Sequence, residues 1–256
     1  MSAQQPHDPR FAQATELTTA TYDKAARDYA ERNERMSPFW AERIEQFLSL
    51  LAEAEERRPI PELGRPGDEI ELEEYLNFIP LLDAGCGTGR DARAFAAAGQ
   101  IVLGADISQG MLDEAGERTA RRLPTGAIRY ALMDMRRLEL PDACCRGVWC
   151  SASMLHLPLR VAPRAMAELA RVARPGAPVA IFLKERGPDG EAERYEPYPT
   201  SAMENATRFY AYYTPDEASA LVAGAGLEII ETTVSEALDH TREHHWVSVL
   251  ARKPEP

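Results

Sequence analysis

Three glycines at alternate positions follow an apolar run and an aspartate. Residues 81–91 read Leu-Leu-Asp-Ala-Gly-Cys-Gly-Thr-Gly-Arg-Asp, so the glycines are Gly85, Gly87 and Gly89. This pattern predicts a buried strand, a tight turn and the start of a helix. Glycine in such a turn permits positive φ and lets a ligand approach the backbone closely. The helix N-terminus beyond it presents unpaired N–H groups, so the stretch predicts a site for a polar, nucleotide-like ligand.

The spacing of these glycines argues against one class of nucleotide site. A dinucleotide fingerprint, Gly-x-Gly-x-x-Gly, requires glycine at position 90. That position holds Arg90, and the third glycine comes one residue early. A nucleotide-dependent oxidoreductase is therefore disfavoured and stays an alternative.

Polar side chains end the strands expected next along the chain. The apolar run 101–105 ends at Asp106, about 20 residues beyond the glycines, where this kind of fold holds ribose hydroxyls. A third strand, Ile128 to Leu132, leads to Asp134, and a fourth ends at Ser151. Ligands of parallel sheets lie outside the carboxyl ends of the strands, so these residues are expected at one site.

The spacing Asp-x-Gly-x-Gly-x-Gly resembles motif I of the class I S-adenosylmethionine (SAM)-dependent methyltransferases. The resemblance runs in order from about Tyr22 to Arg252, nearly the whole chain. It implies an α/β, Rossmann-like fold whose seven-stranded, mostly parallel sheet carries helices on both faces. The last strand is expected to be antiparallel and inserted between strands five and six. SAM is the implied cofactor, and S-adenosylhomocysteine the product.

The resemblance also implies which residues contact SAM. Asp83 is expected to orient backbone groups around the methionyl part, Asp106 to hold the ribose, and Asp134 to meet the adenine amino group. The alternatives are a turn-stabilising Asp83, a helix-capping Asp106 and a solvated Asp134. The other implied contacts are Tyr22, Tyr29, Ala84, Gly85, Gly87, Arg90, Ile107, Met111, Met135 and Ser151.

Several of these residues could equally have a purely structural role. Met111 and Met135 either pack on adenine or belong to the core, and Arg90 either meets the SAM carboxylate or forms a local salt bridge. Tyr22 and Tyr29 lie in a helix similar to one that folds over SAM in many small-molecule methyltransferases. Their rings either contact the cofactor, including its cationic sulfonium, or only pack.

His156 is the candidate general base, because it follows the fourth strand on the ligand side and a histidine accepts protons near neutral pH. The alternative is a structural or substrate-shaping histidine. Glu185, which ends the fifth strand, is the rival base or substrate anchor. His240, His244 and His245 have no carboxylate or thiolate partner at ligand spacing, so no metal site is expected.

The overall composition limits which binding partners and which cellular location are expected. The 29 basic and 41 acidic residues give a formal net charge of −12, which disfavours nucleic acid. A local basic patch stays open, because five arginines lie close together in the sequence: Arg118, Arg121, Arg122, Arg136 and Arg137. No apolar run reaches the ~18 residues of a transmembrane helix, and the N-terminus lacks signal-peptide features. The four cysteines have no zinc-like spacing, which favours reduced thiols and a cytoplasmic location. A monomer or homodimer is expected.

The chain divides into three parts. Residues 1–17 are expected to be a flexible N-terminus, and residues 18–77 a helical cap with an acidic loop from 55 onward. Residues 78–256 form the expected SAM-binding domain, with residues 186–210 as a possible lid. The aromatic run 209–213 either lines a substrate pocket or covers a sheet edge. Thr214-Pro215-Asp216-Glu217 is a capping box that predicts another helix.

The sequence therefore predicts a SAM-dependent methyltransferase acting on an O, N or C nucleophile of a small molecule. Two alternatives stay open: a methyltransferase acting on protein or RNA, and a non-catalytic SAM-binding regulator. No residue of the expected lid or cap identifies the acceptor.

Overall fold

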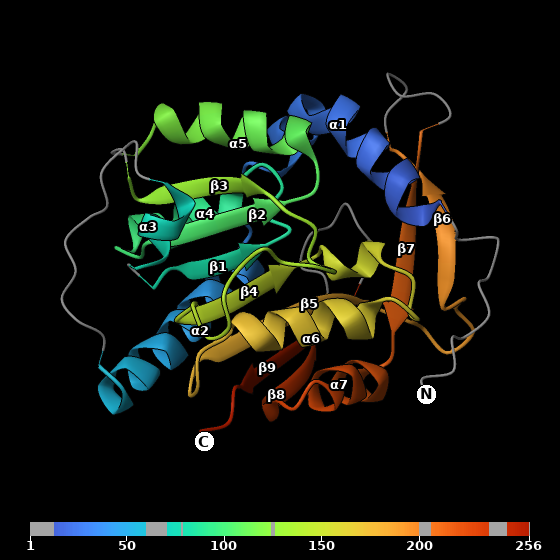
Figure 1. Cartoon of the computed structure of the whole chain (residues 1–256). Helices are drawn as coiled ribbons and strands as arrows, with labels where there is room; N and C mark the ends of the chain where they lie inside the picture. Colours follow the sequence, from blue (N-terminus) through green and yellow to red (C-terminus); the bar gives the residue numbers. More distant parts are fainter. Residues whose placement is uncertain are drawn as a thin grey trace.

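A mixed sheet runs through the centre of the computed structural model, which describes residues 13–59, 71–77, 79–123, 126–199, 206–235 and 245–255. Its strands are β1 (Leu81–Ala84), β2 (Val102–Asp106), β3 (Ile128–Leu132), β4 (Gly147–Ser151), β5 (Pro178–Glu185), β6 (Glu193–Pro197), β7 (Thr207–Tyr213), β8 (Glu228–Ser235) and β9 (Trp246–Arg252). The helices are α1 (Ala14–Asn33), α2 (Pro38–Arg57), α3 (Leu72–Leu76), α4 (Arg90–Ala97), α5 (Gln109–Ala120), α6 (Ala162–Val172), α7 (Pro215–Gly224) and the short 3-10 turn η2 (Met154–His156). Figure 1 shows helices on both sides of the sheet.

Strands β1 to β5 are parallel and lie in the order β3-β2-β1-β4-β5. Beyond β5, β9 runs antiparallel and separates it from β8. These seven strands confirm the predicted sheet, including its inserted antiparallel last strand. Parallel order brings the carboxyl ends of β1 to β5 to the same edge, which is where the fold offers a ligand site.

Two further strands, β6 and β7, occupy part of residues 186–210, where the sequence predicted a lid. β6 and β7 pair with each other in antiparallel fashion, and β7 also pairs with Lys184 and Glu185 at the end of β5. β7 was not predicted as a strand because both of its faces are covered: Phe209 to Tyr213 are all buried, which removes the alternation that identifies a strand. Residues 200–205 of the expected lid lie outside the described residues.

Aromatic side chains fill the space between the sheet and helices α2 and α4. The Trp149 ring on β4 lies 5.3 Å from that of Phe47, 5.2 Å from that of Phe95 and 4.5 Å from that of Phe182. All four side chains are buried, and burial of a side chain such as Phe47 contributes about 1.5–3 kcal/mol. The opposite face packs on α6 and α7, so the sheet that positions the site is rigidly held from both sides.

Both described parts of the segment 55–77 contain helix, where an acidic loop was expected. α2 extends to Arg57, and α3 occupies residues 72–76. α3 is fixed by Tyr75, a buried side chain whose hydroxyl donates a 2.7 Å hydrogen bond to the carbonyl of Val102. One tertiary contact therefore orders a helix too short to be marked by its own periodicity; residues 60–70 lie outside the described part.

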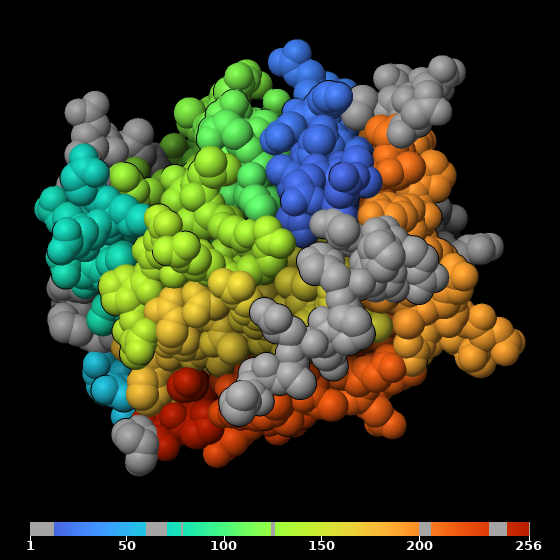
Figure 2. All heavy atoms as spheres, turned by 45° about the vertical axis from the view of Figure 1, so that its right-hand side comes forward, coloured from blue at the N-terminus to red at the C-terminus, as the bar shows by residue number. Residues whose placement is uncertain are grey.

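α1 is held between α5 on one side and β7 on the other (Figures 1 and 2). Toward β7, Thr21 Oγ1 donates to the carbonyl of Thr207, and Thr18 Oγ1 accepts from the Phe209 N–H. Toward α5, Asp23 Oδ1 accepts from Ser108 Oγ at 2.6 Å. The helix begins four residues before the predicted Thr18. These contacts place α1 as a cap over the carboxyl edge of the sheet.

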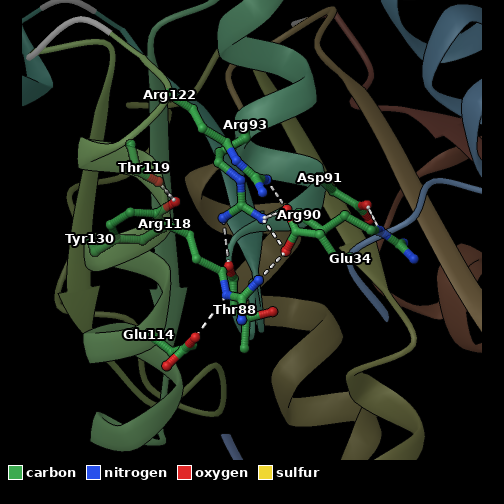
Figure 3. A network of polar contacts seen from close by, with 10 residues as sticks. All are labelled: Glu34, Thr88, Arg90, Asp91, Arg93, Glu114, Arg118, Thr119, Arg122 and Tyr130. Carbon is green, nitrogen blue, oxygen red and sulfur yellow. Dashed lines mark hydrogen bonds and ion pairs between the residues drawn. The ribbon is translucent and has the colours of Figure 1, made fainter. Parts of the chain in front are cut away.

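Glu34, at the C-terminal end of α1, receives three arginines (Figure 3). Arg93 of α4 lies 3.2 Å away, Arg118 of α5 lies 2.9 Å away, and Arg122 also pairs with the same carboxylate. Arg93 additionally donates to the Thr88 carbonyl at 2.7 Å, inside the glycine-rich turn. One carboxylate therefore joins the cap helix to the turn that the site is built on.

We expect Glu34→Gln to lower the free energy of unfolding by about 1–3 kcal/mol, because buried Arg93 loses its charged partner. Urea denaturation measures this loss, and hydrogen exchange should show faster opening of α1. The control is Glu31→Gln, which removes the same charge from an exposed position of the same helix. Equal losses in the two variants would show that Glu34 does not anchor the cap.

Candidate active site

A cavity of about 190 Å³ opens at the carboxyl ends of β1, β2 and β4, beneath α1. Every residue that the sequence singled out for cofactor contact lines it, together with the candidate base. These are Tyr22, Tyr29, Asp83, Ala84, Gly85, Gly87, Arg90, Asp106, Ile107, Met111, Asp134, Met135, Ser151 and His156. The fold therefore brings residues from four strand ends and the cap helix into one site, while their contact with a ligand stays a prediction.

The glycine-rich turn needs glycine for two separate reasons. Gly85, Gly87 and Gly89 all have positive φ, of 72°, 52° and 74°. A Cβ on Gly85 would also lie 2.2 Å from the Cβ of Ser153, which no side chain tolerates. The turn thus passes directly beside the loop that follows β4, and both line the cavity.

Asp106 fixes the same turn from the end of β2. Its Oδ2 accepts from the Gly87 N–H at 2.8 Å, and its Oδ1 accepts from the Ser108 N–H at 2.9 Å. Each carboxylate oxygen keeps a second lone pair for a ligand hydroxyl. Ser108 caps α5 through the Met111 N–H, so the capping role left open for Asp106 belongs to Ser108.

Carboxylates give this cavity its charge. Asp83 is buried, and its Oδ2 has no hydrogen-bond partner among the described residues. Burial, followed by the neighbouring Asp91, raises the pKa of Asp83 well above its usual range, and burial also raises the pKa of Asp106. A positively charged ligand would favour the ionised form of both carboxyl groups, so the site favours such a ligand.

Two predicted contacts already have protein partners. Arg90 Nε donates to Asp91 Oδ1 at 2.7 Å. This is the local salt bridge that the sequence analysis gave as the alternative to contact with the SAM carboxylate. Asp134 accepts from the Arg136 backbone at 2.9 Å and also binds its side chain. Burial opposes ionisation of Asp134, but the Arg136 hydrogen bonds lower its pKa overall.

His156 is held by both ring nitrogens. Its Nδ1 lies 2.7 Å from the Phe209 carbonyl, so this nitrogen must carry the proton and donate. Its Nε2, 2.9 Å from the Tyr22 hydroxyl, then accepts. Burial lowers the pKa of His156 to about 3, and burial raises that of Tyr22 to about 12. The pair is therefore neutral, and His156 serves here as a hydrogen-bond acceptor rather than as a free base.

A second cavity of about 660 Å³ adjoins the first, and Tyr22, Tyr29 and His156 line both. Its wall includes Lys184 at the end of β5, and Tyr210, the one member of the aromatic run 209–213 that lines it. Glu185, the rival base or anchor, lines neither cavity. Neighbouring residues of a strand point to opposite faces, and it is Lys184 that points inward.

Sequence reasoning missed the charged groups of this second cavity. Lys184, Arg194, Glu196 and Arg208 come from β5, β6 and β7, in a region without a recognisable motif. The available signal was Lys184, which directly precedes the predicted Glu185. In the described ranges no group of three histidine, cysteine, aspartate or glutamate residues is arranged to hold a metal ion.

The chain is similar to known methyltransferases. Residues 81–176 match a family model described as a methyltransferase domain. Methyltransferase GfsG of Streptomyces halstedii is 33% identical over 186 residues, which cover 70% of this chain and 64% of that one. The 27-O-demethylrifamycin SV methyltransferase of Amycolatopsis mediterranei is 32% identical over 154 residues, covering 58% and 53%. The chain thus spans less than two thirds of either relative.

A solved structure has the same fold. The 1,6-didemethyltoxoflavin-N1-methyltransferase of Burkholderia thailandensis, with bound 1,6-didemethyltoxoflavin and S-adenosylhomocysteine, superposes with a TM-score of 0.63 at 18% identity. The match covers 100% of this chain and 94% of that one. The domain match, the strand order and the glycine-rich turn together support a class I SAM-dependent methyltransferase.

Proposed function

We propose that this protein transfers a methyl group from SAM to an O, N or C nucleophile of a small molecule, with S-adenosylhomocysteine as product. The main support is the cavity lined by carboxyl groups at the carboxyl ends of β1, β2 and β4, which adjoins a second, larger cavity. One cavity suits the cofactor and the other the acceptor. The small-molecule methyltransferases among its relatives and fold neighbours support the same assignment.

The residues of the first cavity fit SAM in shape and charge. Asp106 offers lone pairs to ribose hydroxyls, and the open space beside Gly87 lets a ligand approach the backbone. The unpartnered Asp83 Oδ2 suits a group that donates hydrogen bonds, and Asp83 and Asp106 together suit a cation. When bound, SAM supplies a methyl group activated by its positive sulfonium.

The chain's own residues orient the reactants and exclude water. Tyr22 and Tyr29, from α1, line both cavities, so they form the boundary across which the methyl group must pass. We assign His156 the role of fixing Tyr22, since its two nitrogens are already engaged. Deprotonation of the acceptor by His156 would require it to release Tyr22 first.

We place the protein in the cytoplasm on the basis of its thiols. Cys86, Cys144, Cys145 and Cys150 are all free, including the adjacent pair whose sulfurs lie 3.6 Å apart. Such thiols fit a reducing compartment.

None of the described helices has the length and apolar character needed to cross a membrane.

We expect Asp106→Ala to weaken S-adenosylhomocysteine binding about 30-fold or more, because a buried hydroxyl pair loses its acceptor, a loss of about 2 kcal/mol. Isothermal titration calorimetry measures the affinity, and circular dichroism checks that the variant folds. Asp113→Ala, an exposed carboxylate on α5, is the matched control and should bind normally. If the unchanged protein binds neither SAM nor S-adenosylhomocysteine, the proposed function fails.

The buried neutral state of His156 predicts a pH-dependent stability. Its folded pKa is about 3, below the ~6.5 of an unfolded histidine. As pH falls through 6.5, the unfolded chain therefore takes up a proton that the folded chain does not. This lowers the unfolding free energy by up to about 1.4 kcal/mol per pH unit, until the pH nears 3.

We expect His156→Gln to unfold with a flatter pH profile than the unchanged protein between pH 6.5 and 4.5, as measured by urea denaturation. His245→Gln, the same change at a largely exposed histidine, is the matched control. An unaltered slope in His156→Gln would show that His156 is protonated in the folded protein.

A further inference from the structure

Arg208, on β7, is a cation without a carboxylate partner among the described residues. It lines the second cavity, and its buried Nε has no hydrogen-bond partner in the described part of the chain. One of its terminal nitrogens lies 3.4 Å from the Tyr22 hydroxyl, a long and weak hydrogen bond. A desolvated guanidinium left in this state is unfavourable unless an anion joins it.

Aromatic rings surround this guanidinium without neutralising it. Its central carbon lies 4.9 Å from the ring centre of Tyr198, 5.1 Å from that of Tyr210 and 5.8 Å from that of Tyr22. These ring faces attract a cation and fix its orientation. A ring face does not take the place of a hydrogen-bond acceptor for the N–H groups, whose planar arrangement matches the two oxygens of a carboxylate.

The other charges nearby add to the positive potential. Lys184 is buried, with its Nζ 3.4 Å from Glu196 and 3.6 Å from the ring centre of Tyr210. Arg194 pairs with the same Glu196 at 2.8 Å. Burial opposes ionisation of Glu196, but the Tyr212 hydrogen bond and the two cations lower its pKa to about 2. Lys184 and Arg194 thus share one carboxylate, and Arg208 has no ion pair with it among the described residues.

The remaining charges on this wall do not reverse that balance. Arg32 pairs with Asp28, and Arg90 with Asp91, so each is neutralised locally. Arg35, an exposed residue of the same wall, adds a further positive charge. Tyr195, Tyr210, Trp40 and Trp246 provide flat apolar surfaces in the same cavity. The cavity therefore combines an unneutralised cation with aromatic walls.

We propose that the second cavity binds the methyl acceptor as an anion, specifically an aromatic carboxylate whose carboxyl group is held by Arg208 beside Lys184. This rests on the proposed function only in calling the ligand the acceptor. Tyr22 contacts Arg208 and lines the cofactor cavity, so a carboxylate on Arg208 lies next to the boundary between the two cavities.

The test compares charged and neutral ligands of the same shape. Benzoate, 1-naphthoate and indole-3-acetate are each titrated beside their primary amides into the full chain saturated with S-adenosylhomocysteine. We expect at least one acid to bind about tenfold or more tightly than its amide, the size of one charge-assisted contact. If no acid binds, or the amides bind equally well, the proposal is overturned.

Arg208→Gln should abolish this preference, weakening the acid about tenfold while leaving the amide and S-adenosylhomocysteine within about twofold. The acid should also raise the thermal midpoint of the unchanged protein and not that of the variant. Arg121→Gln, at an exposed arginine directly after α5, should behave as the unchanged protein does. Arg208→Lys, which keeps the charge but loses the planar fork, should bind the acid with intermediate affinity. Retained preference for the acid in Arg208→Gln contradicts the assignment.

The two proposals fail separately in this design. If S-adenosylhomocysteine binds and no acid is preferred, the anionic acceptor is wrong and the methyltransferase proposal stands. If S-adenosylhomocysteine does not bind, the same acid and amide titrations without it still decide whether the second cavity selects an anion.

Discussion

The hydrogen bond from the Gly87 N–H to Asp106 is the contact on which the site depends. It ties the glycine-rich turn after β1 to the end of β2, and Asp106 binds Ser108 with its other oxygen. Because Ser108 caps α5 and also binds Asp23 of α1, the same short chain of contacts reaches the cap helix. The turn, the neighbouring strand and the cap are therefore positioned together, and the first cavity is the space they enclose.

Charge is separated across the site. The first cavity contains Asp83 and Asp106, while the second contains Lys184 and Arg208. Between them stands the neutral pair of Tyr22 and His156, whose burial keeps it uncharged. A cationic methyl donor and an anionic acceptor would each meet complementary charge, and neither would be favoured in the other's place. Under the proposed function, this arrangement of charges would favour one orientation of donor and acceptor as well as one pair of ligands.

The sequence predicted the parallel core well because most of its strands are short apolar runs with a polar residue near their carboxyl end. Ile128–Leu132 and Gly147–Ser151 have the bounds expected of them. It failed at β5, where residues 179–183 are buried on both faces, so no alternation reveals that Lys184 rather than Glu185 points inward. It also failed for Arg208, since its approach to Tyr22, 186 residues away, is set by tertiary packing alone.

α1 makes the two cavities depend on each other. It contributes Tyr22 and Tyr29 to both, and it is held by hydrogen bonds to β7 and to the start of α5, with Glu34 at its end. A displacement of α1 would therefore open both cavities at once. Conversely, a ligand that contacts Tyr22 from either side stabilises the same helix, which favours binding on the other side. If the two cavities hold cofactor and acceptor as proposed, the two ligands would share the free energy of ordering α1, a helix that lies outside the sheet.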